Sequence, residues 1–113
     1  MTTTTTAPSP LRTDRDARGV VTLTLADPAR FNALGEPMLA ALQQALDAIA
    51  RDEGARVVVL AAEGRAFCAG HDLKAMAQRP EQAYYQKLFA QCSRVMLAIH
   101  RLPVPVIARV QGI

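Results

Sequence analysis

An apolar run that leads through glycines into the start of a helix constrains this sequence more than any other feature. Residues 57–62 are all Val, Leu or Ala, which predicts a fully buried strand over residues 56–62. Gly64 and Gly70 follow, and Asp72 stands where a helix would begin. A strand that passes through small residues into a helix leaves backbone N–H groups unpaired. Such groups can bind negative charge that develops on oxygen.

The rest of the sequence alternates between strand and helix patterns. We predict strands at residues 11–16, 20–25, 56–62 and 104–110, and long helices at residues 36–52 and 81–101. Gly35 is the expected N-cap of the first helix, Gly54 its closing residue, and Pro103 ends the second helix. Strands that alternate with helices predict an α/β layer with parallel strands and right-handed connections.

Composition limits the classes of function. A chain of 113 residues forms at most one domain, and its net charge of +3 comes from scattered arginines, which argues against nucleic-acid binding. Cys68 and Cys92 show neither metal-ligand nor disulfide spacing, which indicates a reducing, cytoplasmic location and no metal site. No apolar run is long enough to cross a membrane. The Thr- and Pro-rich residues 1–10 predict a disordered tail.

Three stretches, in the expected order, resemble motifs of a known family. Residues 65–73, Arg-Ala-Phe-Cys-Ala-Gly-His-Asp-Leu, are similar to the first oxyanion-hole motif of the enoyl-CoA hydratase/isomerase (crotonase) family. Residues 25–34 resemble its CoA-contacting segment, and residues 103–112 resemble the strand that leads to its second oxyanion segment. The resemblance implies a crotonase-like ββα spiral, of which residues 11–113 would be a truncated N-terminal portion.

The resemblance also implies roles for particular residues. The backbone N–H of His71 would donate to the thioester carbonyl oxygen as part of an oxyanion hole. A set of nearby residues would bind substrate: Arg30, Ala33, Ala69, Gly70, Asp72, Leu73 and Lys74. From the residues alone, the preferred interpretation of the loop is a plain strand-to-helix connection, and only the resemblance favours an oxyanion hole. We prefer Asp72 as a helix cap over Asp72 as an acid, and the backbone of His71 over its imidazole as the functional group.

Four further side chains have plain structural interpretations. Arg30 fits the charge of a CoA phosphate but equally fits an exposed loop arginine. Lys74 is by default solvated, and Glu63 is interpreted as a solvated turn carboxylate rather than a catalytic acid. Cys68 has no visible histidine partner, so a nucleophilic role is not expected.

The expected ligand is an acyl-CoA thioester, with CoA as part of the substrate and no separate cofactor. The reaction stays open among hydratase (lyase), isomerase and related chemistry of fatty acid metabolism. The resemblance places the second oxyanion donor and the catalytic carboxylates after residue 113. We therefore expect residues 1–113 alone not to hydrate or isomerise acyl-CoA, nor to form the homotrimers or hexamers of full-length members. The alternative is a catalytically inactive CoA-binding or interaction module.

Overall fold

The computed structural model of the chain describes residues 9–112. The elements, in chain order, are β1 (Leu11–Arg15), β2 (Val20–Leu25), the short 3-10 helix η1 (Pro28–Arg30), α1 (Glu36–Ala50), β3 (Val57–Ala62), α2 (Leu73–Gln78), α3 (Gln82–Arg101) and β4 (Val106–Ala108). The predicted tail at residues 1–10 falls mainly on residues 1–8, which lie outside the described part. None of the helices in residues 9–112 combines the length and the apolar character needed to cross a membrane.

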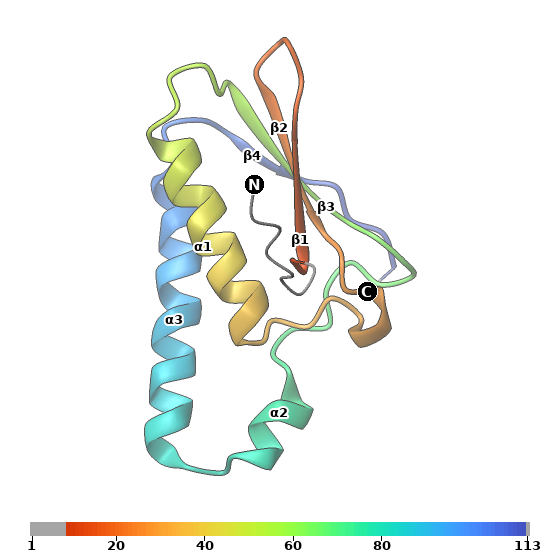
Figure 1. Cartoon of the computed structure of the whole chain (residues 1–113), viewed down its shortest axis with the longest axis vertical. Coiled ribbons are helices and arrows are strands. Elements are labelled where there is room, and N and C mark those ends of the chain that lie inside the picture. Colours follow the sequence, from red (N-terminus) through yellow and green to blue (C-terminus); the bar gives the residue numbers. More distant parts are fainter. Residues whose placement is uncertain (1–8, 113) are drawn as a thin grey trace, which may run out of the picture.

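The four strands form one sheet in the order β1-β2-β3-β4 (Figure 1). β1 pairs with β2 in the antiparallel direction, whereas β2 with β3 and β3 with β4 are parallel. The parallel pairs are joined through α1 and α3 respectively. The predicted α/β layer with helical crossovers is therefore confirmed.

The turn between β1 and β2 is built around the carboxylate of Asp16. Its Oδ1 accepts hydrogen bonds from the backbone N–H groups of Arg18 and Val20, at 2.8 and 3.1 Å. The side-chain hydrogen bond from Arg18 is the largest cause that holds the pKa of Asp16 below its ordinary value of 3.8. The resulting stabilisation is present above that ordinary value and is lost as the pH falls through the lowered pKa.

The core lies between the sheet and the pair of helices α1 and α3, which pack against each other. Alternate residues of β2 face this core: Val21, Leu23 and Leu25 are at most 3% exposed. The helices contribute stripes spaced three and four residues apart: Met38, Leu39, Leu42, Leu46 and Ile49 from α1, and Tyr84, Leu88 and Val95 from α3. This spacing is what buries one face of a helix, as the sequence predicts.

Three predicted details are wrong. β3 is not fully buried, because only Val58 and Ala61 of its six residues are buried and the others are half-buried. Gly54 does not close α1, which ends at Ala50 with Arg51 as its C-cap. β4 is shorter than the predicted residues 104–110 and covers only Val106–Ala108, the residues that pair with β3.

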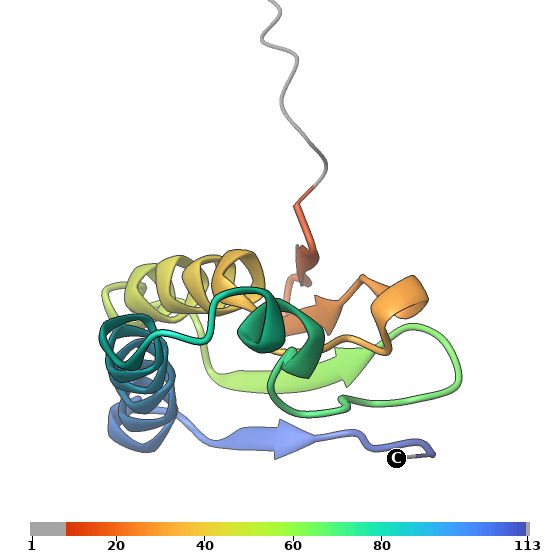
Figure 2. The same ribbon diagram turned by 90° about the horizontal axis from the view of Figure 1, so that it is seen from below.

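The carboxyl ends of the parallel strands gather at one end of the molecule. Figure 2 shows η1, the loop that follows β3 and the end of the chain meeting there. These are residues 26–35, 63–72 and 109–112. Loops at the carboxyl ends of parallel strands are where α/β folds commonly bind ligands, so this end is the place to look for a site.

Candidate functional site

Two of the motifs singled out in the sequence lie against each other. The Ala69 N–H donates to the carbonyl oxygen of Phe31 at 3.0 Å, and the Leu34 N–H donates to that of Gly70 at 2.7 Å. Leu34 and His71 form an isolated parallel bridge. The segment after η1 and the loop after β3 are therefore held in register by backbone hydrogen bonds.

The backbone N–H of His71 follows a glycine with open space beside it. Gly70 has φ +86°, in the left-handed region that favours glycine, and a Cβ placed on it would meet no atom within 4 Å. The Ala69 N–H donates to the carbonyl oxygen of Phe31, and the Gly70 N–H donates to Cys68 Sγ, with 3.5 Å between nitrogen and sulfur. Within residues 9–112, no acceptor is bonded to the His71 N–H. This donor therefore has no hydrogen-bond partner among the described residues.

A cavity of about 450 Å³ adjoins the loop. It is lined by Ala29, Arg30, Ala33, Asp72, Lys74, Ala75 and Gln78. Four of the predicted substrate-binding residues thus share one cavity, and two of them are cationic. Ala69 and Gly70 do not line the cavity, but their backbone bonds to Phe31 and Leu34 hold them next to the segment that does. Leu73 is 72% exposed at the start of α2 and does not line this cavity.

The side chain of His71 points toward a second, more apolar space. Its ring packs edge-on against Phe89, with ring centroids 5.3 Å apart, and its Nδ1 is buried without a partner in the described part of the chain. A cavity of about 460 Å³ is lined by His71, Phe89, Cys92, Ser93, Met96 and Leu97. Adjacent residues, His71 and Asp72, therefore line two different cavities.

Asp72 is the N-cap of α2. Its Oδ1 accepts a hydrogen bond from the Ala75 N–H at 3.0 Å, which satisfies one of the unpaired donors of the first turn. The preference for capping over acid catalysis is consistent with this geometry. α2 buries none of its residues, and the side chain of Leu73 at its start is exposed.

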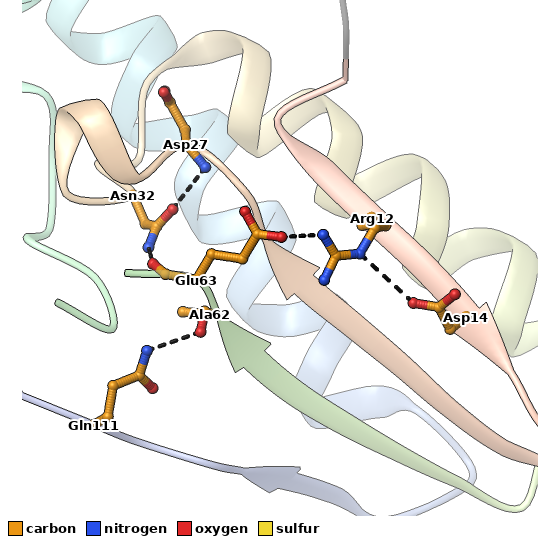
Figure 3. Close-up of polar contacts among 7 residues, drawn as sticks. All are labelled: Arg12, Asp14, Asp27, Asn32, Ala62, Glu63 and Gln111. Carbon is orange, nitrogen blue, oxygen red and sulfur yellow. Dashed lines mark hydrogen bonds and ion pairs between the residues drawn. The ribbon is translucent and has the colours of Figure 1, made fainter. Parts of the chain in front are cut away.

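Asn32 holds the two segments together from inside. It is fully buried, and its Oδ1 accepts a hydrogen bond from the Asp27 N–H at 2.8 Å (Figure 3). Its Nδ2 donates to the carbonyl oxygens of Glu63 and Ala66, at 2.9 and 3.1 Å. The resemblance of residues 25–34 to a CoA-contacting segment would place Asn32 against CoA. That is wrong, since a side chain with no exposed surface cannot touch a ligand.

Gln111 makes a similar contact from the other end of the chain. Its Nε2 donates to the carbonyl oxygen of Ala62 at 2.8 Å (Figure 3). It also donates to that of Gly64, at 3.2 Å. The Glu63 carboxylate turns away and pairs with Arg12 on β1. The sequence does not reveal this role of Gln111. Every residue has a carbonyl oxygen, so no sequence pattern shows which one a side-chain amide will bind.

Comparison with known proteins identifies the family. The sequence model of the enoyl-CoA hydratase/isomerase family matches residues 20–113, which include the loop and both cavities. This chain belongs to the enoyl-CoA hydratase/isomerase family. Its fold is that of the crotonases, as the resemblance implied: the crystal structure of an enoyl-CoA hydratase from Mycobacterium smegmatis superposes with a TM-score of 0.88 at 65% identity. The superposition covers 89% of this chain and 39% of that one.

Other family members show the same partial coverage. The mitochondrial enoyl-CoA hydratase domain-containing protein 3 of Mus musculus is 36% identical over 103 residues, covering 91% of this chain and 34% of that protein. The 1,2-epoxyphenylacetyl-CoA isomerase of Escherichia coli is 33% identical over 106 residues, covering 85% and 38%. The chain thus spans about a third to two fifths of the length of these enoyl-CoA hydratase/isomerase relatives. Its cytoplasmic location stays a prediction.

Proposed function

We propose that this family member binds an acyl-CoA thioester across the loop after β3. The CoA phosphates would lie near Arg30 and Lys74, whose positive charges suit them. The thioester carbonyl oxygen would accept a hydrogen bond from the His71 N–H. The observation that carries the proposal is the adjacency of a cavity with two cationic side chains and an unused backbone donor.

The donor would favour a thioester enolate over the neutral thioester. Removal of a proton next to the carbonyl group, or addition of water to a conjugated double bond, places negative charge on the carbonyl oxygen. A fixed N–H aimed at that oxygen typically contributes about 3 kcal/mol in the transition state. Nearby carboxylates are otherwise engaged, since Glu63 pairs with Arg12 and Asp72 caps α2. The described residues therefore supply binding and charge stabilisation rather than proton transfer.

The apolar cavity next to the His71 ring suits the acyl chain. His71 and Asp72 are neighbours and line the two cavities, so a thioester at the His71 N–H would have CoA on one side and its hydrocarbon on the other. Phe89 and Met96, 45% and 44% exposed, offer apolar surface there. Covering such surface with hydrocarbon is favourable.

Replacing both cations tests the proposed phosphate site. The Arg30→Ala/Lys74→Ala double variant should bind acyl-CoA about 10-fold more weakly at low salt, and the difference should shrink at high salt because the attraction is screened. Isothermal titration measures the dissociation constant. The control is Lys87→Ala, which removes an exposed cation from α3. Equal affinity for the double variant and the control would contradict the proposed site.

A further inference from the structure

The segment that follows β3 is held from two sides by side-chain amides. Asn32 donates to the carbonyl oxygens of Glu63 and Ala66, and Gln111 donates to those of Ala62 and Gly64. Four carbonyl oxygens within residues 62–66 are thus bound by two amides from distant parts of the sequence. We call Asn32 and Gln111 the amide clamp.

The side chain of Gln111 replaces a backbone donor at the point where the β4 ladder ends. The parallel ladder between β3 and β4 ends where the Arg109 N–H donates to the carbonyl oxygen of Leu60, at 2.9 Å. A regular strand would next pair the backbone N–H of residue 111 with the carbonyl oxygen of Ala62. The side chain of Gln111 takes that acceptor instead and reaches Gly64 as well. One side chain therefore fixes the exit of β3 beyond the end of the sheet.

Close backbone approaches support both arms of the clamp. Gly112 has φ +59°, and a Cβ there would lie 2.1 Å from the carbonyl oxygen of Arg65. Gly64 has φ +89°, and a Cβ there would lie 2.8 Å from the Cβ of Pro28, at η1. Residues 62–66 therefore lie between η1 and the segment after β4, with glycine at each tight contact.

We infer that the amide clamp positions the loop so that the His71 N–H faces the thioester carbonyl oxygen. Residues 62–66 begin the loop and residues 69–71 end it, where they bond to Phe31 and Leu34. Asn32 lies beside Phe31, so it couples both ends of the loop. Neither Gln111 nor Asn32 lines the two cavities. They would therefore act on a ligand only through the loop that they hold, as positioning residues. The consequence for binding rests on the proposed function.

A Gln111→Met variant separates positioning from folding. Methionine has nearly the same shape as glutamine but cannot donate a hydrogen bond. The matched control is Gln44→Met, which replaces an exposed glutamine of α1. Amide hydrogen exchange over residues 63–71 should be about 10-fold faster in Gln111→Met and unchanged in Gln44→Met. Equal exchange in the two variants would overturn the clamp, whether or not the chain binds CoA.

The second measurement is the preference for thioester over free CoA. The ratio of dissociation constants for CoA and acetoacetyl-CoA reports the contact with the carbonyl oxygen. Because small misplacements of an aligned group are costly, the ratio should fall about 10-fold in Gln111→Met while the affinity for CoA itself is kept. A fall in both affinities, or faster exchange with an unchanged ratio, would overturn the positioning role. Failure of the unsubstituted chain to bind any acyl-CoA would instead overturn the proposed function.

Discussion

Replacing Asn32 by alanine is expected to destabilise the chain by about 3–5 kcal/mol, which lowers Tm by about 15–30 °C. The change leaves the partly buried Asp27 N–H and Glu63 carbonyl oxygen, and the buried carbonyl oxygen of Ala66, without their partner. Each buried polar group left unpaired costs about 1–3 kcal/mol. The backbone of Asn32, at φ 54°, adds to this because alanine is strained there. Thermal unfolding followed by circular dichroism measures the loss.

Two companion variants identify the cause of that loss. Asn32→Gly removes the amide but accepts the left-handed backbone, so it should recover only the part of the loss due to strain, about 1 kcal/mol. Gln44→Ala removes an exposed amide and should leave Tm within about 2 °C of the unsubstituted chain. A Tm for Asn32→Ala as high as that of Gln44→Ala would show that the buried amide does not hold the two segments together.

Replacing His71 by proline is expected to weaken binding of the enolate of acetoacetyl-CoA about 100-fold, because proline has no N–H to donate. His71→Ala keeps the donor and should bind within about 3-fold of the unsubstituted chain, although it loses the packing against Phe89. Isothermal titration above the pKa of the ligand gives both constants.

Free CoA controls for a general disturbance of the His71→Pro variant. It lacks the thioester carbonyl group, so its affinity should be nearly the same for both His71 variants. An alanine variant as weak as the proline variant toward acetoacetyl-CoA would assign the contact to the imidazole and contradict the backbone donor. A proline variant that also loses CoA would show that the loop has moved.

The elements could be predicted where a local pattern decides them. The apolar spacing of α1 and α3 and the β-branched run of β2 place these elements within about two residues, because each pattern reflects one buried face. The cap at Asp72 was predicted from its residue type and position. The ends of β4 and the exposure of β3 depend on which neighbours cover them. Such partners are set by the tertiary structure and leave no local signal.

In the candidate site, too, some features could be predicted from the sequence and others could not. Resemblance to the family placed Arg30, Ala33, Asp72 and Lys74 together, and the structure puts them around one cavity. Asn32 lies within the stretch that resembles the CoA-contacting segment, yet its side chain is fully buried. Gln111 is separated by about fifty residues from the carbonyl oxygens that it binds. Contacts between a side chain and distant backbone atoms are specific in space but carry no sequence signature.

The direct test of the central claim is to follow the His71 amide by NMR while the ¹⁵N-labelled chain is titrated with two ligands. One is crotonyl-CoA, and the other is its thioether analogue, which has the same length but no carbonyl oxygen. If the His71 N–H binds the thioester oxygen, its proton signal moves downfield with crotonyl-CoA and stays nearly unchanged with the thioether, while signals around Arg30 and Lys74 respond to both. Equal responses of the His71 amide to the two ligands, or none to either, would contradict the account.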